Sequence, residues 1–304
     1  MALTEEQYSK RQNSVGGSDV PAILGLSPFK SSSDIYLAKT VGVQQSTSSA
    51  IEAGHQLESA VIEWGMERLK IEDMKWSSAN VRRTKTLNCT KGGSVPAHAN
   101  MDFMFIAPEI GRCGLEAKTT SYRYGWGEEY TDEIPEHVLL QCLWQAEVAD
   151  LNMVHVAVLI ADRGFHFKMY EVDPAQYEEE REQMINAVGN FWNNHVMEEK
   201  PPEDTLPSVE TLKKVIRTPN KSTNIEENDV KLWLEAKDKV SEAQKEEKLL
   251  REKVLNTMVD AEEGQCSLGT LTYYEYDRKG YEVAPTKYRQ IKWRRKEPHE
   301  RSSD

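Results

Sequence analysis

Paired cysteines are missing from this chain. Its four cysteines, Cys89, Cys113, Cys142 and Cys266, are scattered over 304 residues without a CxxC motif. This spacing argues against a zinc site, an iron–sulfur cluster and a disulfide framework. We therefore expect free thiols, most of them buried.

Long apolar runs are missing as well. No stretch approaches the roughly 20 consecutive apolar residues that a membrane-spanning helix needs. The first residues, MALTEEQYSKRQ, are polar and do not show the charged, apolar and small-residue succession of a secretory signal peptide. We expect a cytoplasmic protein that makes no membrane contact.

Acidic residues outnumber basic ones over the whole chain, but one segment near the end reverses this balance. The whole chain has a net charge of -12. From Arg278 to Arg301, however, nine Lys or Arg stand against three Glu, a net charge of +6. This asymmetry favours a basic contact surface carried by an acidic body, with a solvated tail as the alternative.

Helix and strand patterns alternate along the first part of the chain, with no internal repeat. Apolar residues at helical spacing, or capping residues ahead of apolar ones, predict helices within 14–25, 27–42, 51–70, 133–150 and 173–196. Alternating apolar residues predict strands within 80–89, 98–107, 113–120, 153–162 and 164–173. This order predicts an α/β core over residues 1–200.

The remaining third of the chain has a different composition. Three prolines, Pro201, Pro202 and Pro207, indicate a linker over 201–225. Residues 226–263 are predicted to form one long, charged helix that ends at Gly264. Glu247 interrupts its apolar seam, so we expect a packed arm rather than a full coiled coil. The end of the 226–304 region alternates enough for one or two basic, aromatic strands.

Three charged side chains stand in a predicted hairpin that is otherwise apolar. Glu116 and Lys118 are one strand period apart, so both side chains leave the same face, and Asp102 on the neighbouring strand can meet them. The backbone carbonyl of Ala117 can point at the same centre. Two carboxylates and a carbonyl suit a hard cation such as Mg²⁺ or Mn²⁺, beside an ammonium group.

This arrangement resembles the PD-(D/E)xK nuclease signature, with MD at 101–102 and EAK at 116–118. Five segments occur in the order expected of the YqaJ viral recombinase family, whose relatives include the λ phage exonuclease. They are SVGGSDVPAILGLSPFKSSSDIYL, AGHQLESAVIEW, HANMDF, LEAKTT and DEIPEHVLLQCLWQAEVAD. Together they cover most of residues 11–150.

The resemblance implies a fold and a set of site residues. The fold is an α/β, restriction-endonuclease-like core with a central mixed β-sheet flanked by helices, followed by a long helix and a short β extension. Asp102 and Glu116 look like the metal carboxylates and Lys118 like the catalytic lysine. Glu58 resembles the helix-borne acid that completes the metal shell, and Gln141 the glutamine that positions the attacking water.

The resemblance also implies a substrate and partners. Arg11 and Ser18 match an Arg and a Ser associated with binding the 5′-phosphate end of DNA. The implied reaction is 5′ to 3′ digestion of linear double-stranded DNA with two Mg²⁺ ions, which leaves 3′ overhangs. A single-strand annealing protein, a ring of three subunits and the cytoplasm of a bacterial or phage-infected cell follow by family analogy.

Several alternatives stay open. An endonuclease of the same fold would share the three hairpin groups, and a noncatalytic DNA-binding or scaffold protein could use them as a structural network. Leu143 stands where relatives often have a second glutamine, so we expect its role to be absent. Tyr122, Tyr124 and Trp126 could stack on unpaired bases or simply pack within the fold.

Overall fold

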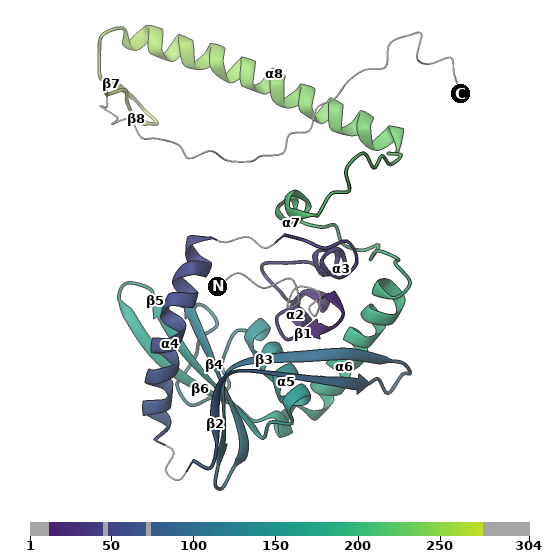
Figure 1. Ribbon diagram of the computed structural model, residues 1–304. Helices are drawn as coiled ribbons and strands as arrows, with labels where there is room; N and C mark the ends of the chain where they lie inside the picture. The colour runs from purple at the N-terminus through teal and green to yellow at the C-terminus, as the bar shows by residue number, and fades with distance from the viewer. Residues whose placement is uncertain (1–11, 45–47, 71–73, 276–304) are drawn as a thin grey trace. The chain divides into compact units, whose positions relative to one another are not determined.

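The computed structural model describes residues 12–44, 48–70 and 74–275. The chain divides into two compact units, one up to Ile216 and one from Arg217 onward, and each is described by itself (Figure 1). Arg11 and the basic segment 278–301 lie outside the described residues.

The first unit contains the predicted alternation of helices and strands. Its elements are β1 (Val15–Gly16), α2 (Val20–Ile23), α3 (Ser32–Thr40), α4 (Ser49–Leu69), β2 (Ser77–Asn88), β3 (Ser94–Ala107), β4 (Gly111–Thr120), α5 (Glu136–Ala149), β5 (Met153–Ala161), β6 (Phe165–Val172), the 3₁₀ helix η1 (Pro174–Tyr177), α6 (Glu178–Phe191), the π-helical turn η2 (Trp192–Val196) and α7 (Val209–Lys214).

Six strands of this unit form one mixed sheet. The order is β1-β3-β4-β5-β6, and β2 also pairs with β3. The β1–β3 and β4–β5 pairs are parallel, and the other pairs are antiparallel. The expected α/β class, with a central mixed sheet flanked by helices, is confirmed.

Strand β3 has an unusual pairing that matters for the site. Because β2 runs along one edge of β3, both β1 and β4 must use the other edge. Strand β1 takes Ala97 and His98, and β4 begins to pair at Phe103. Within the described chain no strand pairs with residues 99–102 on that edge, which leaves a gap between β1 and β4.

The sheet is covered on both faces, so most residues at its centre are buried. In β5 every residue from Val154 to Ile160 is buried, as expected for a strand with helices on either side. Helix α4 packs over one face around Val61 and Leu115, whereas α5 and α6 cover the other face with residues such as Trp144. The four cysteines are free and three are buried, which confirms the expectation from their spacing.

The short helix α2 does not begin as predicted. Asp19 occupies the N-cap position, but its carboxylate accepts hydrogen bonds from the Gly16 amide at 3.1 Å and from Lys39 at 2.7 Å instead of capping the helix. Ser18 is exposed. Asp19 therefore fixes the turn before α2 rather than the first turn of the helix.

The first unit extends past residue 200, the boundary expected from the sequence. The Ser33 hydroxyl donates to the Thr205 carbonyl at 2.8 Å, and the Ser208 amide donates to the Asp34 carboxylate at 2.7 Å. Val215 then pairs with Val43 in an isolated bridge. These contacts tie the proline-containing segment to α3 and bring α7 into this unit.

The second unit consists of α8 (Glu227–Met258) and the hairpin of β7 (Glu263–Cys266) and β8 (Gly269–Thr272). The helix ends at Met258 and not at Gly264, because Val259 adopts a φ of 50° and Gly264 belongs to β7. Although α8 has 32 residues, neither it nor any other helix in the described ranges is apolar enough to cross a membrane.

Candidate active site

Side chains of α5 fill the gap in the edge of β3. The Trp144 indole donates to the His98 carbonyl at 3.1 Å, and the Gln145 amide donates to the Asn100 carbonyl at 3.1 Å. Both donors are buried. A backbone carbonyl left unpaired inside a protein costs free energy, so these two side chains replace the missing strand partner.

Asp102 stands at the far side of the same gap. The registered pairs of β3 and β4 stop at Phe103 and Leu115, and the Ala117 amide donates to Asp102 Oδ2 at 2.8 Å. A side-chain carboxylate thus takes the position of a ladder acceptor. The two strands separate here, which makes room for polar side chains between them.

Glu116 is the centre of the hydrogen-bond network. Its Oε1 accepts from Lys118 Nζ at 2.6 Å and from Gln141 Nε2 at 2.6 Å. Its Oε2 accepts from Gln145 Nε2 at 2.7 Å. Lys118 also donates to Gln141 Oε1 at 2.9 Å, so three side chains from β4 and α5 form a closed set. Because Glu116 is only 4% exposed, its carboxylate depends on these donors.

The charges of this cluster influence one another strongly. Burial and then the charge of Glu116 raise the pKa of Asp102 to about 8, against the Ala117 amide and Lys118, which lower it. Burial disfavours the ammonium form of Lys118, but Glu116 and then Asp102 outweigh it and raise the pKa of Lys118. Lys118 therefore stays charged at neutral pH, and one ammonium group is shared between two acids.

Glu58 does not touch the cluster. Its side chain, on α4, is 32% exposed and lies 3.7 Å from His55 Nδ1. It is near enough for its charge to contribute to the raised pKa of Asp102. In the described part of the chain, no group of three or more His, Cys, Asp or Glu side chains is placed to hold a metal ion. The predicted convergence thus extends to Asp102 and Glu116 but not to Glu58.

The chemistry of the acid pair nevertheless fits a hard divalent cation. Asp102 and Glu116 offer carboxylate oxygens, the ligand type that Mg²⁺ and Mn²⁺ prefer. A bound cation would offset the burial and the charge of Glu116, which in that order raise the pKa of Asp102. Gln145 occupies only one of the two lone pairs of Glu116 Oε2, so this oxygen can accept a further partner.

Gln145 is the site residue that sequence reasoning missed. The absence of glutamine at position 143 led us to expect that a second amide was missing. Gln145 supplies one from the next helical turn after Gln141, because residues four apart share a face of a helix. The i, i+4 spacing of two glutamines in an apolar helix was the available signal.

The glycine pair before α2 brings the N-terminal segment close to this network. A Cβ atom on Gly17 would lie 3.2 Å from Gln141 Cγ and 3.3 Å from its carbonyl oxygen. Only glycine allows this approach without displacement. Ser18, the described member of the predicted 5′-phosphate pair, is therefore next to a residue that contacts Gln141. His98, beneath the loop, bonds Ser14 Oγ at 2.8 Å, which is a structural role.

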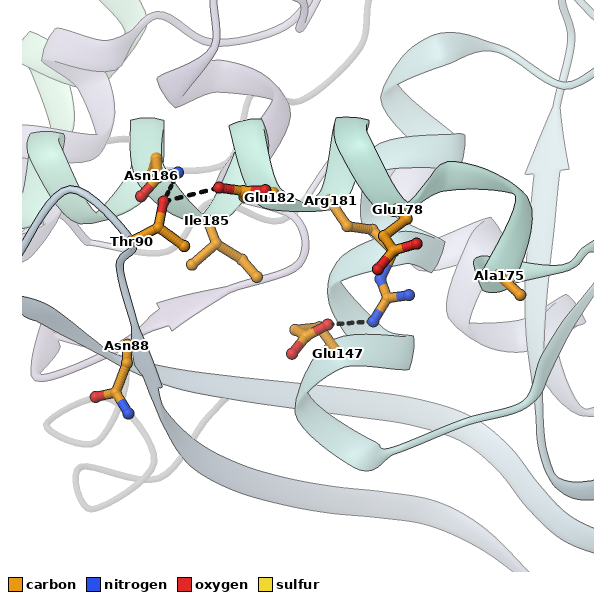
Figure 2. A pocket seen from close by; sticks show the side chains of 9 residues that line it. All are labelled: Asn88, Thr90, Glu147, Ala175, Glu178, Arg181, Glu182, Ile185 and Asn186. Carbon is orange, nitrogen blue, oxygen red and sulfur yellow. Dashed lines mark hydrogen bonds and ion pairs between the residues drawn. The ribbon is translucent and has the colours of Figure 1, made fainter.

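A cavity of about 450 Å³ lies elsewhere, between the end of β2, the end of α5 and α6 (Figure 2). Figure 2 shows the ion pair of Arg181 with Glu147 and the hydrogen bond from Thr90 to Glu182. The ion pair joins Arg181 Nη2 and Glu147 Oε2 at 2.5 Å. None of the predicted site residues lines it. The predicted residues Asp102, Glu116, Lys118 and Gln141 therefore gather at the gap in β3 rather than at this cavity.

The chain is similar to a protein family and to a curated protein. The family described as YqaJ-like viral recombinase domain matches residues 8–152, a range that includes β3, β4 and α5. The protein YqaJ of Bacillus subtilis (strain 168) is 30% identical over 271 residues, which is 86% of this chain and 80% of the relative.

Two solved structures resemble this chain at low similarity. The alkaline exonuclease LHK-Exo of Laribacter hongkongensis is 13% identical, with a TM-score of 0.42 over 65% of this chain and 96% of that one. A phage related exonuclease of Haemophilus somnus 129PT is 13% identical, with a TM-score of 0.41 over 63% and 99%. At these scores neither structure bears on function. The assignment follows from the family match and the Bacillus relative: the chain belongs to the YqaJ-like viral recombinase domain family.

Proposed function

We propose that this protein is a metal-dependent deoxyribonuclease that hydrolyses phosphodiester bonds. The observation that carries the proposal is the cluster of Asp102, Glu116 and Lys118 in the gap of β3, with Gln141 bonded to both Glu116 and Lys118. Two carboxylates can hold a divalent ion for phosphodiester hydrolysis, and an ammonium group beside them can offset charge on the phosphate. Membership in a viral recombinase family supports DNA as the substrate.

We further propose that the enzyme is a 5′ to 3′ exonuclease on linear double-stranded DNA that leaves 3′ overhangs. The position of Ser18 supports this direction, because it follows Gly17, which packs against Gln141. A 5′-phosphate held by Ser18 and Arg11 would then lie beside the acid pair. A ring of three subunits and a single-strand annealing partner belong to the same proposal by family analogy.

Each residue of the cluster has a distinct task. Asp102 and Glu116, with Glu58 as a third acid, would hold Mg²⁺ or Mn²⁺, which would supply Lewis acidity toward water and phosphate. Lys118, kept protonated by Glu116, offsets the negative charge that develops on the phosphate. Gln141 fixes the orientation of Lys118 and Glu116 by accepting from one and donating to the other.

A single comparison of substrates tests the proposal. Purified protein is incubated with Mg²⁺ and 5′-phosphorylated linear duplex, 5′-hydroxyl linear duplex or closed circular duplex. We expect rapid digestion of the first, slower digestion of the second and none of the third. Lys118→Ala is expected to lose digestion while its circular dichroism spectrum is unchanged.

The other outcomes separate the alternatives. Cutting of closed circles would identify an endonuclease. Full activity of Lys118→Ala would refute the assignment of the cluster. If no substrate is cut, and neither the unaltered protein nor Asp102→Ala binds Mg²⁺, the protein is a noncatalytic DNA-binding or scaffold protein.

A further inference from the structure

Three aromatic side chains are exposed around the beginning of α5. Phe29 is 74% exposed, Tyr122 is 75% exposed and Tyr124 is 95% exposed. We call these three residues the aromatic rim. Large apolar rings usually lose their contact with water when a protein folds. A group of exposed rings beside a candidate active site therefore indicates a binding surface.

Phe29 is connected to the acid pair through α5. Its ring centroid lies 5.7 Å from that of His137, and the two rings are nearly perpendicular. His137 precedes Gln141 by one helical turn, about 6 Å along the axis. Burial and then the charge of Lys118 lower the pKa of His137, which places that ring within electrostatic reach of the amine. Phe29 thus contacts the turn of α5 that comes just before the one carrying Gln141.

The two tyrosines reach the same end of α5 from β4. Thr120 ends β4 two residues after Lys118, and its hydroxyl accepts a hydrogen bond from the Tyr122 amide at 3.0 Å. Gly125 then packs against Pro135, the N-cap of α5, since a Cβ on Gly125 would lie 3.3 Å from Pro135 Cγ. The loop therefore crosses the beginning of the helix whose first turn carries His137.

Contacts with β6 hold this loop in place, so its tyrosines are exposed as part of the folded structure. Trp126 is buried and its ring lies 5.3 Å from that of Tyr170. The Gly127 carbonyl accepts from Lys168 at 2.7 Å and from the Tyr170 hydroxyl at 3.1 Å. Of the three aromatic residues noted in the sequence, Trp126 packs within the fold, whereas Tyr122 and Tyr124 do not.

We infer that the aromatic rim stacks on unpaired nucleobases of a DNA strand whose backbone enters the acid cluster. The inference rests on the proposed nuclease function. Exposed rings interleaved with cations are the usual surface for single-stranded nucleic acid, and Lys30 and Arg123 are exposed beside Phe29 and between the tyrosines. The rim would hold the end of a duplex open, with bases on the rings and a phosphate at Lys118.

Binding to a single strand tests this inference without cleavage. Lys118→Ala protein is mixed, in the presence of a chelator, with a fluorescent oligothymidine or with an abasic oligomer of the same length and charge. We expect tighter binding of oligothymidine, since only it has bases to stack. Replacing Phe29, Tyr122 and Tyr124 together by Ala is expected to reduce this preference by about fivefold or more for each ring that stacks.

Two further variants make the result specific. Phe29→Trp keeps an aromatic face and is expected to preserve the preference for bases. Trp76→Ala is the matched control, because Trp76 is 40% exposed but lies beside Ile106, at the turn end of β3 and away from Thr120. A triple variant with an unchanged preference for oligothymidine would overturn the inference.

The failure of this inference can be told apart from failure of the proposed function. If the unaltered protein digests linear duplex but the rim variants keep their preference for bases, the rim inference alone is wrong. If nothing is digested but the preference depends on the rim, the inference about base stacking stands and the nuclease proposal falls.

Discussion

Helices α5 and α8 were both predicted from the sequence, but their surroundings differ. In α5 nine of 14 residues are buried, among them the polar Gln145. Of the 32 residues of α8, all of which the structure describes, only Met258 is buried. Both were predicted as helices from spacing alone. The comparison teaches that helical periodicity does not reveal whether a helix can hold a side chain in a fixed place.

The two helices are also stabilised in different ways. Helix α5 is held by the apolar core of the sheet and by hydrogen bonds to β3 and β4. Helix α8 relies on pairs within itself, such as Glu247 with Arg251 at 3.7 Å and Lys248 with Glu252 at 3.9 Å. Exposed i, i+4 pairs contribute little each and orient nothing beyond the helix. The side chains that donate to Glu116 from a helix are accordingly found on α5.

The largest effect is expected from removing the indole of α5. Trp144 is fully buried and donates to the His98 carbonyl, so Trp144→Ala leaves a cavity and an unpaired acceptor. We expect the free energy of unfolding to fall by about 3–5 kcal/mol. Urea denaturation followed by circular dichroism measures this change. A loss below about 1 kcal/mol would show that burial does not hold α5.

A buried histidine in the sheet gives the next largest effect, and it depends on pH. His155 on β5 is 3% exposed, and neither ring nitrogen has a hydrogen-bond partner among the described residues. Burial lowers its pKa to about 4, below the value of about 6.5 for an unfolded chain. Between these values the unfolded chain binds more protons than the native protein. Stability should therefore fall as pH falls from 6.5 to 4, by about 3 kcal/mol in total.

His155→Phe is expected to remove this part of the pH dependence. The substitution keeps a ring stacked on Phe105, whose centroid lies 5.9 Å away, and adds no titrating group. Urea denaturation at pH 7 and pH 5 compares the two proteins. Residues 217–275 contain no histidine, so the helicity of α8 should show no matching change. An identical pH slope in both proteins would rule out His155 as its source.

A smaller effect is expected where α5 meets the acid cluster. Gln145→Leu preserves the size of the side chain but removes the donor to Glu116 Oε2 and to the Asn100 carbonyl. We expect kcat/KM for linear duplex to fall by about 10- to 100-fold, as when a residue that orients a ligand is lost. Gln265→Leu makes the same change at an exposed position of β7 and should have no effect.

The smallest effect is expected for the tryptophan of α8. Trp233 is 40% exposed, so Trp233→Ala should change the free energy of unfolding by no more than about 0.5 kcal/mol. It is the same substitution as Trp144→Ala and is measured in the same way. A loss comparable to that of Trp144→Ala would show that α8 is packed in solution, and the contrast between the helices would disappear.

The sequence was sufficient for the local part of the site. Asp102, Glu116 and Lys118 lie on two strands joined by a short turn, so the period of two and the antiparallel pairing bring them together without reference to the rest of the chain. The helix that carries Gln141 was also predicted from its apolar face. These features depend on neighbours in sequence, which pattern reasoning can use.

The rest of the site depends on distant parts of the chain. Strand β1 has two residues, too few for any pattern, yet its parallel pairing at Ala97 and His98 creates one side of the gap. Gln145 looked like an ordinary helical residue in the sequence, because the partners of its amide, Asn100 and Glu116, come close to it only at the gap. The helix of Glu58 was predicted, but periodicity cannot tell how far a side chain reaches across a sheet.

The hydrogen bond from the Ala117 amide to Asp102 offers a direct spectroscopic view of the site. In most strands an amide reports on a neighbouring backbone carbonyl, whereas this one points at a carboxylate that belongs to the acid pair. Its resonance in a nitrogen–proton correlation spectrum is thus expected to move when Mg²⁺ is added, ahead of any change in the helices. A single peak in the unmodified protein would then follow occupancy of the centre in real time.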